Sequence, residues 1–445
     1  MPEAATEPLV DPRATDVERP LFERFGRRTL ETFLGFALSS AANSIYLLVV
    51  ARALGPRGTG VVSVGILLAS GLAFIVSIAP ALANVYFGAR DARDHAALLS
   101  NSLLFAAGPA VLTSAFTLAV LEATGLRFGA EWYELAIVLA SVPFVVGGRL
   151  VQTLIVASGR SRAFNVLNTL GPILALAFAG LAFVVAGTHV WTALSAYSAA
   201  QIAVLALSLG AAQIVPGSPS RRLLSRSLRY GGRGFVANMI QVLNYRLDLF
   251  FVSSIRGPAA AGVYSIAVLL AELLWKIAAA ANTILFPRVA ADEKAPVAFT
   301  LRVGRVVVLL TSVAAIILIP VTEWIVLPLL KAEFADALLP LTLLLPGVVA
   351  LALAQILSGD LSGRGKPEYA SYASAAGLII TLTLTPVLIV PFGASGAAVA
   401  STLSYVVTTA FFAGVFVRRF GVSLADLFLA RPDDFLRSRS PERPY

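Results

Sequence analysis

Long apolar segments recur through almost the whole chain and constrain its fold more than any other feature. A segment of about 20 apolar residues is long enough to cross the hydrocarbon core of a bilayer as a helix. Of the 445 residues, 58% are hydrophobic and 13% are charged, and this charged fraction is roughly half that of a soluble protein. We therefore predict an all-α polytopic membrane protein with about twelve transmembrane helices. The expected spans are 29–52, 59–84, 97–121, 133–157, 165–187, 190–213, 230–253, 260–286, 303–328, 335–358, 370–391 and 394–417.

The segments outside these spans indicate how the chain is divided. Residues 1–28 are charged and contain no apolar stretch like that of a signal peptide, so we expect a disordered tail there. A basic stretch follows the sixth span, and we interpret it as a linker between two halves of the chain. The expected division is a tail at 1–28, an N-lobe at 29–213, the linker at 214–229, a C-lobe at 230–417 and a second tail at 418–445.

Lys and Arg residues are distributed unevenly between the two ends of the spans. Most of the 34 lie in the tails, the linker and the loops on the same side as these segments. Because basic segments remain in the cytoplasm, we expect both tails to be cytoplasmic. This topology and contact with anionic lipids account for the net charge of +9, so nucleic acid is not an expected partner. The connecting segments on the opposite side contain only Arg52, Arg57, Arg127, Arg256 and Lys331.

An internal repeat relates the two halves of the chain. The sequence GPRGTGVVSVGILLA at 55–69 aligns without gaps on GPAAAGVYSIAVLLA at 257–271, with eight identities in fifteen positions. A shorter match relates ASGRSRA at 157–163 to LSGRGKP at 361–367. Because each half has an even number of spans, the halves have the same orientation, related by an axis along the membrane normal. Such parallel repeats are typical of transporters that bind their substrate between the halves near the middle of the membrane.

Two charged residues lie within the span at 230–253, in the sequence YRLD. A charged side chain in the middle of a membrane helix costs at least about 2.5–3.5 kcal/mol and normally faces protein or a wet cavity. Arg246 and Asp248 are about 160° apart around a regular helix, so we do not expect them to pair on one face. Asp248 instead shares a polar face with Asn238, Gln241 and Tyr245.

Other polar residues within the spans complete the candidate site. Arg binds phosphate bidentately, so Arg149 and Arg246 are candidates for binding an anion in a central cavity. The expected substrate-binding set also contains Asn43, Gln152, Gln241 and Lys276, while Asp248 and Glu272 are candidates for coupling to Na⁺ or H⁺, or for balancing the Arg charges.

Structural roles are the alternative interpretation of the same residues. Glu272 and Lys276 are four positions apart, in the order that favours an ion pair within one helix. Asn and Ser residues in the spans can serve only to link helices by hydrogen bonds. The chain has no cysteine, and its two histidines, His95 and His189, are far apart, so we expect no metal site, no cofactor and no catalytic residue.

Three short motifs in register with the repeat suggest a family. They are ARALGP followed by Gly60, the YRLD sequence followed by GPAAAGVY, and the GRSR and GRGK sequences after the fourth and tenth spans. Over residues 29–418 the chain resembles the polysaccharide transporters of the MATE-like multidrug/oligosaccharidyl-lipid/polysaccharide exporter superfamily. This resemblance implies a V-shaped bundle of two lobes that alternates access. Of the candidate residues, Arg246 matches the Arg of the family's RLD motif, and Arg149 has less support.

The resemblance also implies a function. We expect a flippase that moves a lipid-linked oligosaccharide, such as an undecaprenyl-pyrophosphate glycan, to the outer leaflet of the bacterial inner membrane. Its expected partners are this substrate, membrane lipids, and glycosyltransferases and a polymerase of the same pathway. One alternative is a MATE-like multidrug or cation antiporter, which would favour an acidic or aromatic cavity. A second is a membrane glycan polymerase or ligase, although the expected external loops are short for such an enzyme.

Overall fold

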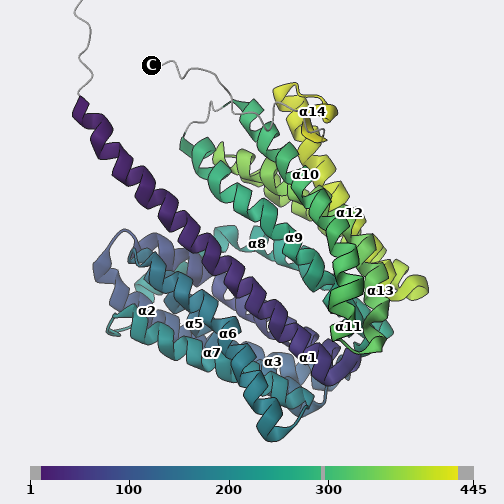
Figure 1. Cartoon of the computed structure of the whole chain (residues 1–445). Coiled ribbons are helices and arrows are strands. Elements are labelled where there is room, and N and C mark those ends of the chain that lie inside the picture. The colour runs from purple at the N-terminus through teal and green to yellow at the C-terminus, as the bar shows by residue number, and fades with distance from the viewer. Residues whose placement is uncertain (1–11, 292–295, 429–445) are drawn as a thin grey trace, which may run out of the picture.

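The structure, a computed structural model, describes residues 12–291 and 296–428, and within these ranges all regular elements are helices (Figure 1). The α-helices are α1 (Pro12–Gly88), α2 (His95–Phe105), α3 (Val111–Thr124), α4 (Trp132–Ala140), α5 (Val142–Ala157), α6 (Ser161–Ala186), α7 (Val190–Ala212), α8 (Arg221–Arg256), α9 (Pro258–Ala291), α10 (Val297–Val321), α11 (Leu327–Leu329), α12 (Leu338–Gly363), α13 (Glu368–Phe420) and α14 (Leu424–Phe428). Short π or 3₁₀ segments connect some of them: η1 (Ala92–Asp94), η2 (Ala106–Ala110), η3 (Thr322–Val326) and η4 (Ala332–Ala337).

The helices correspond to the expected spans. Nine helical segments in the described part of the chain are long and apolar enough to cross a membrane. Two of them, within α1 and α13, each consist of two helices joined at Gly55 (φ 73°) or Gly393 (φ 58°), where glycine tolerates a positive φ. The more polar α8 supplies the seventh expected span. The prediction of an all-α polytopic membrane protein is therefore confirmed.

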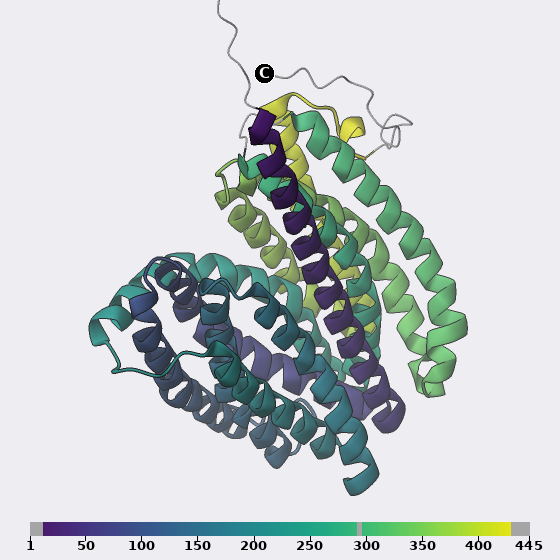
Figure 2. The same ribbon diagram turned by 60° about the vertical axis from the view of Figure 1, so that its left-hand side comes forward.

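The helices form two groups. Figures 1 and 2 show α2–α7 together in one group and α9–α14 in another, with α1 running between them. Buried apolar side chains form separate clusters, around Val138 and Leu150 in the first group and around Tyr264 and Leu341 in the second. We call the groups the N-lobe and the C-lobe. They diverge toward the side at which α1 begins and α13 ends, the terminal side, and approach each other on the opposite side, the far side (Figure 1).

A reciprocal contact between glycines joins the lobes on the far side. A Cβ atom on Gly60 would lie 1.8 Å from the carbonyl oxygen of Pro258, and one on Gly262 would lie 1.9 Å from that of Pro56. One turn away, the Ser63 hydroxyl donates a hydrogen bond to Ser265 Oγ at 3.2 Å, between residues 202 positions apart. The same 202-residue offset relates Gly60 to Gly262 and the two copies of the sequence repeat. Equivalent residues therefore meet at an approximate two-fold axis, as the repeat predicts.

The ends of several elements differ from the expected domain limits. Helix α1 begins at Pro12, so residues 12–28 are helical and not part of a disordered tail, whereas residues 1–11 lie outside the described chain. Residues 12–28 extend the helix that follows them, and extending a helix avoids the cost of nucleating a new one. A charged segment can therefore be helical there. Only residues 213–220 separate α7 from α8, so the linker is shorter than 214–229. Within the second expected tail, α14 packs through its buried Leu427.

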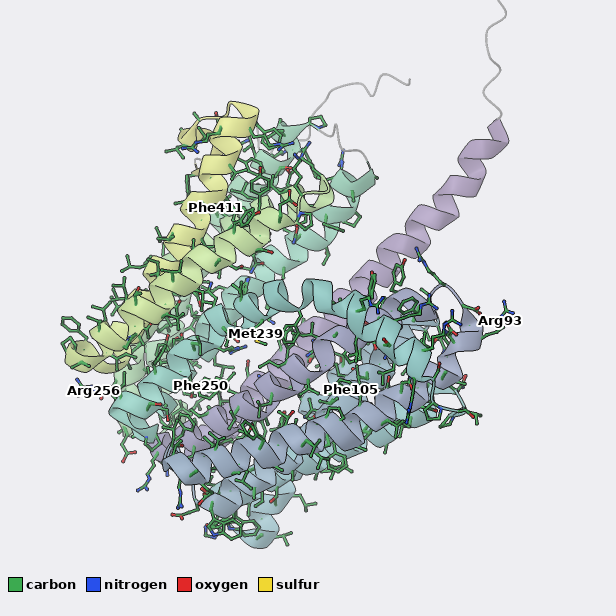
Figure 3. All side chains as sticks on the ribbon, turned by 180° about the vertical axis from the view of Figure 1, so that it is seen from behind. Arg93, Phe105, Met239, Phe250, Arg256 and Phe411 are labelled. Carbon is green, nitrogen blue, oxygen red and sulfur yellow. The ribbon has the colours of Figure 1, made fainter. Side chains whose placement is uncertain are left out.

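Helix α8 contacts both lobes. The predicted C-lobe at 230–417 placed this helix in one lobe. Near its start, the Tyr230 ring stacks on Tyr86 of α1 with centroids 4.2 Å apart, and a Cβ on Gly231 would lie 2.1 Å from the Ala79 carbonyl oxygen. Farther along, Asn244 Oδ1 accepts a hydrogen bond from Thr381 of the C-lobe at 3.0 Å. Figure 3 shows the helix passing from the N-lobe to the C-lobe, with Met239 between them.

The close approach at Gly60 should not tolerate even a methyl group. We expect Gly60→Ala to lower the melting temperature, because a Cβ would overlap the backbone of Pro258 and overpacking costs about 1–3 kcal/mol. Gly71→Ala on the same helix is the control, since no atom lies within 4 Å of a Cβ there. Thermal unfolding of both variants in the same detergent measures the difference. Equal melting temperatures would contradict the packing described here.

Candidate functional site

The N-lobe contains a cavity of about 520 Å³. Helices α1, α5, α6 and α7 line it, and three of the predicted substrate-binding residues, Asn43, Arg149 and Gln152, lie in its wall. The amide groups of Asn168 and Gln201 also line it. Sequence reasoning missed these two, because a single amide in a membrane helix is equally typical of a link between helices. The cavity thus combines one cationic side chain with several hydrogen-bonding amides.

Arg149 is the charged group of this cavity. Its guanidinium carbon lies 4.3 Å from the centroid of the Phe74 ring, a cation–π contact. Among the described residues, no carboxylate lies within ion-pair distance of its side chain. One turn along α5, the Gln152 amide donates to Ser208 Oγ of α7 at 3.3 Å. Arg149 is half-buried in the bundle. None of the described carboxylates balances its charge.

Arg246 has a different environment. Its Nη1 lies 2.8 Å from Glu272 Oε1 of α9, and the two side chains are 44% and 30% exposed. Arg246 also lines a cavity of about 110 Å³ between α1 and α8, together with Leu67, Leu72 and Phe250. It therefore lies where the two lobes face each other, with its charge balanced by Glu272.

The position of Glu272 distinguishes between two pairings that the sequence left open. Glu272 bonds to Arg246 of the neighbouring helix. Lys276, one turn farther along α9, is exposed, and none of the described carboxylates lies within ion-pair distance of it. The intrahelical pair suggested by the spacing of Glu272 and Lys276 does not form.

Asp248 is buried within the C-lobe. Its Oδ2 accepts hydrogen bonds from Tyr264 Oη at 2.6 Å and from Ser401 Oγ at 3.1 Å, while Oδ1 accepts one from the Leu249 amide at 2.8 Å. As helix geometry predicts, Asp248 and Arg246 face different surroundings. Sequence reasoning missed Tyr264 and Ser401, although one signal was available: Tyr264 is a position at which the two repeats differ, since the first has Val62 there.

The remaining predicted residues on α8 cannot be placed in the same way. The side chains of Asn238, Gln241 and Tyr245 lie outside the described part of the structure. The expectation that Gln241 binds substrate therefore stays a prediction.

The two copies of the SGR sequence have a structural role at the terminal side. Arg160 donates to Gln213 Oε1 at 2.7 Å and to the carbonyl oxygen of Ala212, at the end of α7. Arg364 forms a buried ion pair with Asp360 at 2.7 Å, and Asp360 also accepts a hydrogen bond from Thr300. Both arginines thus hold helix ends together.

Residues 49–339 match the family described as "Polysaccharide biosynthesis protein". The chain belongs to this family. None of the curated proteins compared with the chain matches it significantly.

Several solved structures have the same fold. The lipid II flippase MurJ in an inward closed conformation has a TM-score of 0.77 at 11% identity, over 89% of this chain and 88% of MurJ. An inward-facing multidrug resistance MATE family transporter of the MOP superfamily has a TM-score of 0.71 at 15% identity, over 86% of this chain and 94% of its own. An outward-facing MATE transporter has a TM-score of 0.60 at 18% identity, over 88% and 94% of the two chains. The chain is a multi-pass membrane protein of this MATE-like fold.

The family is thus described by polysaccharide biosynthesis, and the structures of the same fold are described as a flippase and as transporters.

The pairing of Glu272 can be tested by double-mutant cycles. We expect the cycle between Arg246→Ala and Glu272→Ala to give a coupling energy of about 0.5–1 kcal/mol, a modest value because both side chains are partly exposed. The matched cycle between Glu272→Ala and Lys276→Ala should give a value near zero. Thermal or chemical unfolding in detergent provides both numbers, and stronger coupling to Lys276 would contradict the pairing.

Proposed function

We propose that the protein is a flippase for a lipid-linked oligosaccharide in the biosynthesis of cell-surface polysaccharide. Its substrate carries a pyrophosphate between an undecaprenyl chain and the glycan, and moves from the inner to the outer leaflet of the bacterial inner membrane by alternating access. Both chain ends are cytoplasmic in this proposal. The observation that carries it is Arg149, whose charge faces the N-lobe cavity without a described carboxylate partner.

The chemistry of an anionic headgroup explains why such an arginine would be useful. An ionised group cannot enter hydrocarbon without a very large loss of hydration energy. A guanidinium group replaces part of that hydration with two parallel hydrogen bonds to phosphate oxygens. The amides of Asn43, Gln152 and Gln201 in the same cavity can supply further hydrogen bonds.

The arrangement of the lobes supports entry from the terminal side. On the far side the glycine contact is reinforced by Arg52, which donates to the Leu329 carbonyl, and by Lys331, which donates to that of Ala53 at 3.4 Å. The headgroup would enter between the lobes where they diverge, while the undecaprenyl chain remains in the lipid. Separation of the lobes on the far side would then release it to the other leaflet.

Acidic residues of the C-lobe have two proposed roles. Glu272 balances the charge of Arg246, which makes Arg246 a weaker anion site than Arg149. The hydroxyl groups of Tyr264 and Ser401 donate hydrogen bonds to Asp248, and a bound ion can replace these hydrogen bonds. We therefore assign Asp248 to coupling with H⁺ or Na⁺. Lys276, exposed on α9, makes an early contact with the anionic headgroup in this proposal.

The alternatives fit the site less well. A drug or cation antiporter would favour carboxylates in its binding cavity, and none of the described residues lining the N-lobe cavity is acidic. A glycan polymerase or ligase needs a catalytic group exposed outside the membrane, and the described loops on the far side are short. Glycosyltransferases and a polymerase of the same pathway are the expected partners of a flippase.

Removal of Arg149 tests the proposed function most directly. In proteoliposomes, Arg149→Ala should reduce translocation of an undecaprenyl-pyrophosphate oligosaccharide by at least about tenfold, since a charge-assisted pair with phosphate contributes about 1.5–3 kcal/mol. Arg149→Lys should retain part of the activity. Arg93→Ala removes the same charge from a side chain that is 92% exposed and is the control. Unchanged translocation by Arg149→Ala would refute the assignment.

The role of Asp248 predicts a different phenotype. We expect Asp248→Asn to insert normally but to lose the dependence of translocation on an imposed H⁺ or Na⁺ gradient. Asp336→Asn, at an exposed position outside the C-lobe core, should behave like the wild type. The assay compares initial rates with and without each gradient. A normal gradient response by Asp248→Asn would exclude it as the coupling residue.

A further inference from the structure

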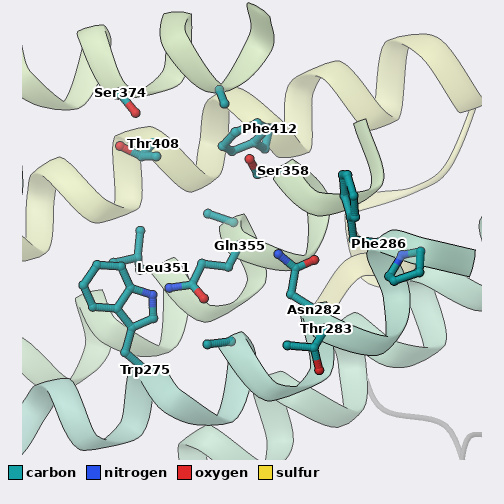
Figure 4. Close-up of a pocket in the computed structure, with 14 residues that line it drawn as sticks. Trp275, Asn282, Thr283, Phe286, Leu351, Gln355, Ser358, Ser374, Thr408 and Phe412 are labelled. Atoms are coloured by element: carbon teal, nitrogen blue, oxygen red, sulfur yellow. The ribbon is translucent and has the colours of Figure 1, made fainter. Parts of the chain in front are cut away.

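The C-lobe contains a second cavity, of about 660 Å³. Helices α9, α12 and α13 line it, and Figure 4 shows side chains of all three directed into it. Its volume lies within the roughly 300–1,000 Å³ that is usual for ligand pockets. Its wall combines aromatic and uncharged polar groups, among them Trp275, Asn282, Gln355, Ser358, Ser374 and Phe412.

Several polar groups in this wall have unused hydrogen-bonding capacity. Gln355, Ser358 and Ser374 make no side-chain hydrogen bond to another described residue. Asn282 Oδ1 is buried and has no hydrogen-bond partner. Gln355, Ser358 and Ser374 are half-buried in the cavity wall and can pair with a ligand that both donates and accepts hydrogen bonds, whereas Asn282 Oδ1 packs against Gly359.

The cavity differs from that of the N-lobe in charge. Arg149 lines the N-lobe cavity, whereas all described residues lining the C-lobe cavity are uncharged. The helices are equivalent in the repeat: the SGR sequence lies at the ends of both α5 and α12, and the helices that follow complete both walls. Of these two equivalent cavities, one is therefore cationic and the other neutral among the described lining residues.

The helix that begins each half contributes differently to the two cavities, as far as the described side chains show. In the N-lobe, Ser39, Asn43 and Tyr46 of α1 line the cavity. The counterpart of this part of α1 is α8, yet none of the described α8 residues lines the C-lobe cavity, since the start of α8 packs on the N-lobe through Tyr230 and Gly231.

We propose that the C-lobe cavity binds neutral sugar residues of the transported glycan while the N-lobe cavity holds its pyrophosphate. This inference rests on the proposed flippase function. The indole of Trp275 offers an apolar face for the C–H groups of a sugar ring. The amide of Gln355 and the hydroxyls of Ser358 and Ser374 match the donors and acceptors of sugar hydroxyl groups.

Other occupants fit this wall less well. An undecaprenyl chain would leave the Gln355 and Asn282 amides without partners. A cationic drug would have no carboxylate among the described lining residues, and a phosphate group would have no cation there. The unfilled hydrogen-bonding groups and the neutral wall together select an uncharged, hydroxyl-rich ligand.

The test compares binding of lipids with and without a sugar to the full-length protein in nanodiscs. The probes are undecaprenyl pyrophosphate itself and four derivatives that carry N-acetylglucosamine, N-acetylgalactosamine, glucose or galactose. We expect the wild type to bind at least one derivative about tenfold more tightly than the sugar-free lipid, a difference of about 1.4 kcal/mol. Gln355→Met keeps the side-chain volume and should abolish this preference without changing the affinity for the sugar-free lipid, which also shows that the variant is folded.

Two further variants separate the sugar site from the anion site. Thr283→Val alters the same cavity at a hydroxyl already donated to the Ala280 carbonyl oxygen, so it should retain the preference. Arg149→Ala should weaken binding of all five lipids by the same factor. Equal affinity of the wild type for all five lipids, or a preference that survives Gln355→Met, would overturn the sugar site while leaving the flippase proposal intact. Failure of the wild type to bind any of the lipids would refute the flippase proposal itself.

Discussion

The reciprocal contact of Gly60 and Gly262 is the constraint on which the arrangement of the lobes depends. A carbonyl oxygen of the other repeat packs against each glycine so closely that a Cβ atom would not fit there. The backbones of α1 and α9 therefore approach closely at this point. Gly55 and Gly257 end the preceding helices with positive φ values of 73° and 84°, which aims both following helices at the axis. In each repeat the first glycine of the GP-x-x-x-G sequence thus forms the turn between two helices, and the last glycine packs against the other repeat.

The course of α8 breaks this symmetry. Its far-side half belongs to the C-lobe through Asp248 and Asn244, whereas its start is fixed to the N-lobe by Tyr230 and Gly231. The equivalent part of α1 stays with the N-lobe, where the Ser39 hydroxyl donates to the Asn168 carbonyl oxygen. Residues of α1 consequently line the N-lobe cavity, whereas none of the described α8 side chains lines the C-lobe cavity. Lobes that are similar in fold thereby acquire different surfaces toward the space between them.

Much of the fold could be predicted from the sequence, but the partners of the charged residues could not. Apolar length and glycine position identified the spans and the repeat, because both depend on properties local to a segment. Helical geometry also separated Arg246 from Asp248. The pairing of Arg246 with Glu272 depends on how α8 lies against α9, so the spacing of Glu272 and Lys276 was misleading. The uncharged C-lobe cavity was missed for the same reason: Trp275 and Gln355 come from different helices, and neither is unusual within its own.

In the proposed cycle the far-side closure must open, and part of it consists of interactions that break easily. Its centre is backbone packing of glycines, beside which Ala51 and Val64 of α1 pack in the buried cluster of the C-lobe. Hydrogen bonds also cross it, from Ser63 to Ser265 and from the exposed Arg52 and Lys331 to carbonyl oxygens. Such exposed bonds exchange readily for bonds to water and contribute only about 0.5–1.5 kcal/mol each. The buried hydrogen bonds of Asp248, by contrast, lie within one lobe and need not break when the lobes separate. The hydrogen bonds of Asp248 thus hold the C-lobe together throughout the proposed cycle, whereas the exposed bonds on the far side are among those that must break when the lobes separate there.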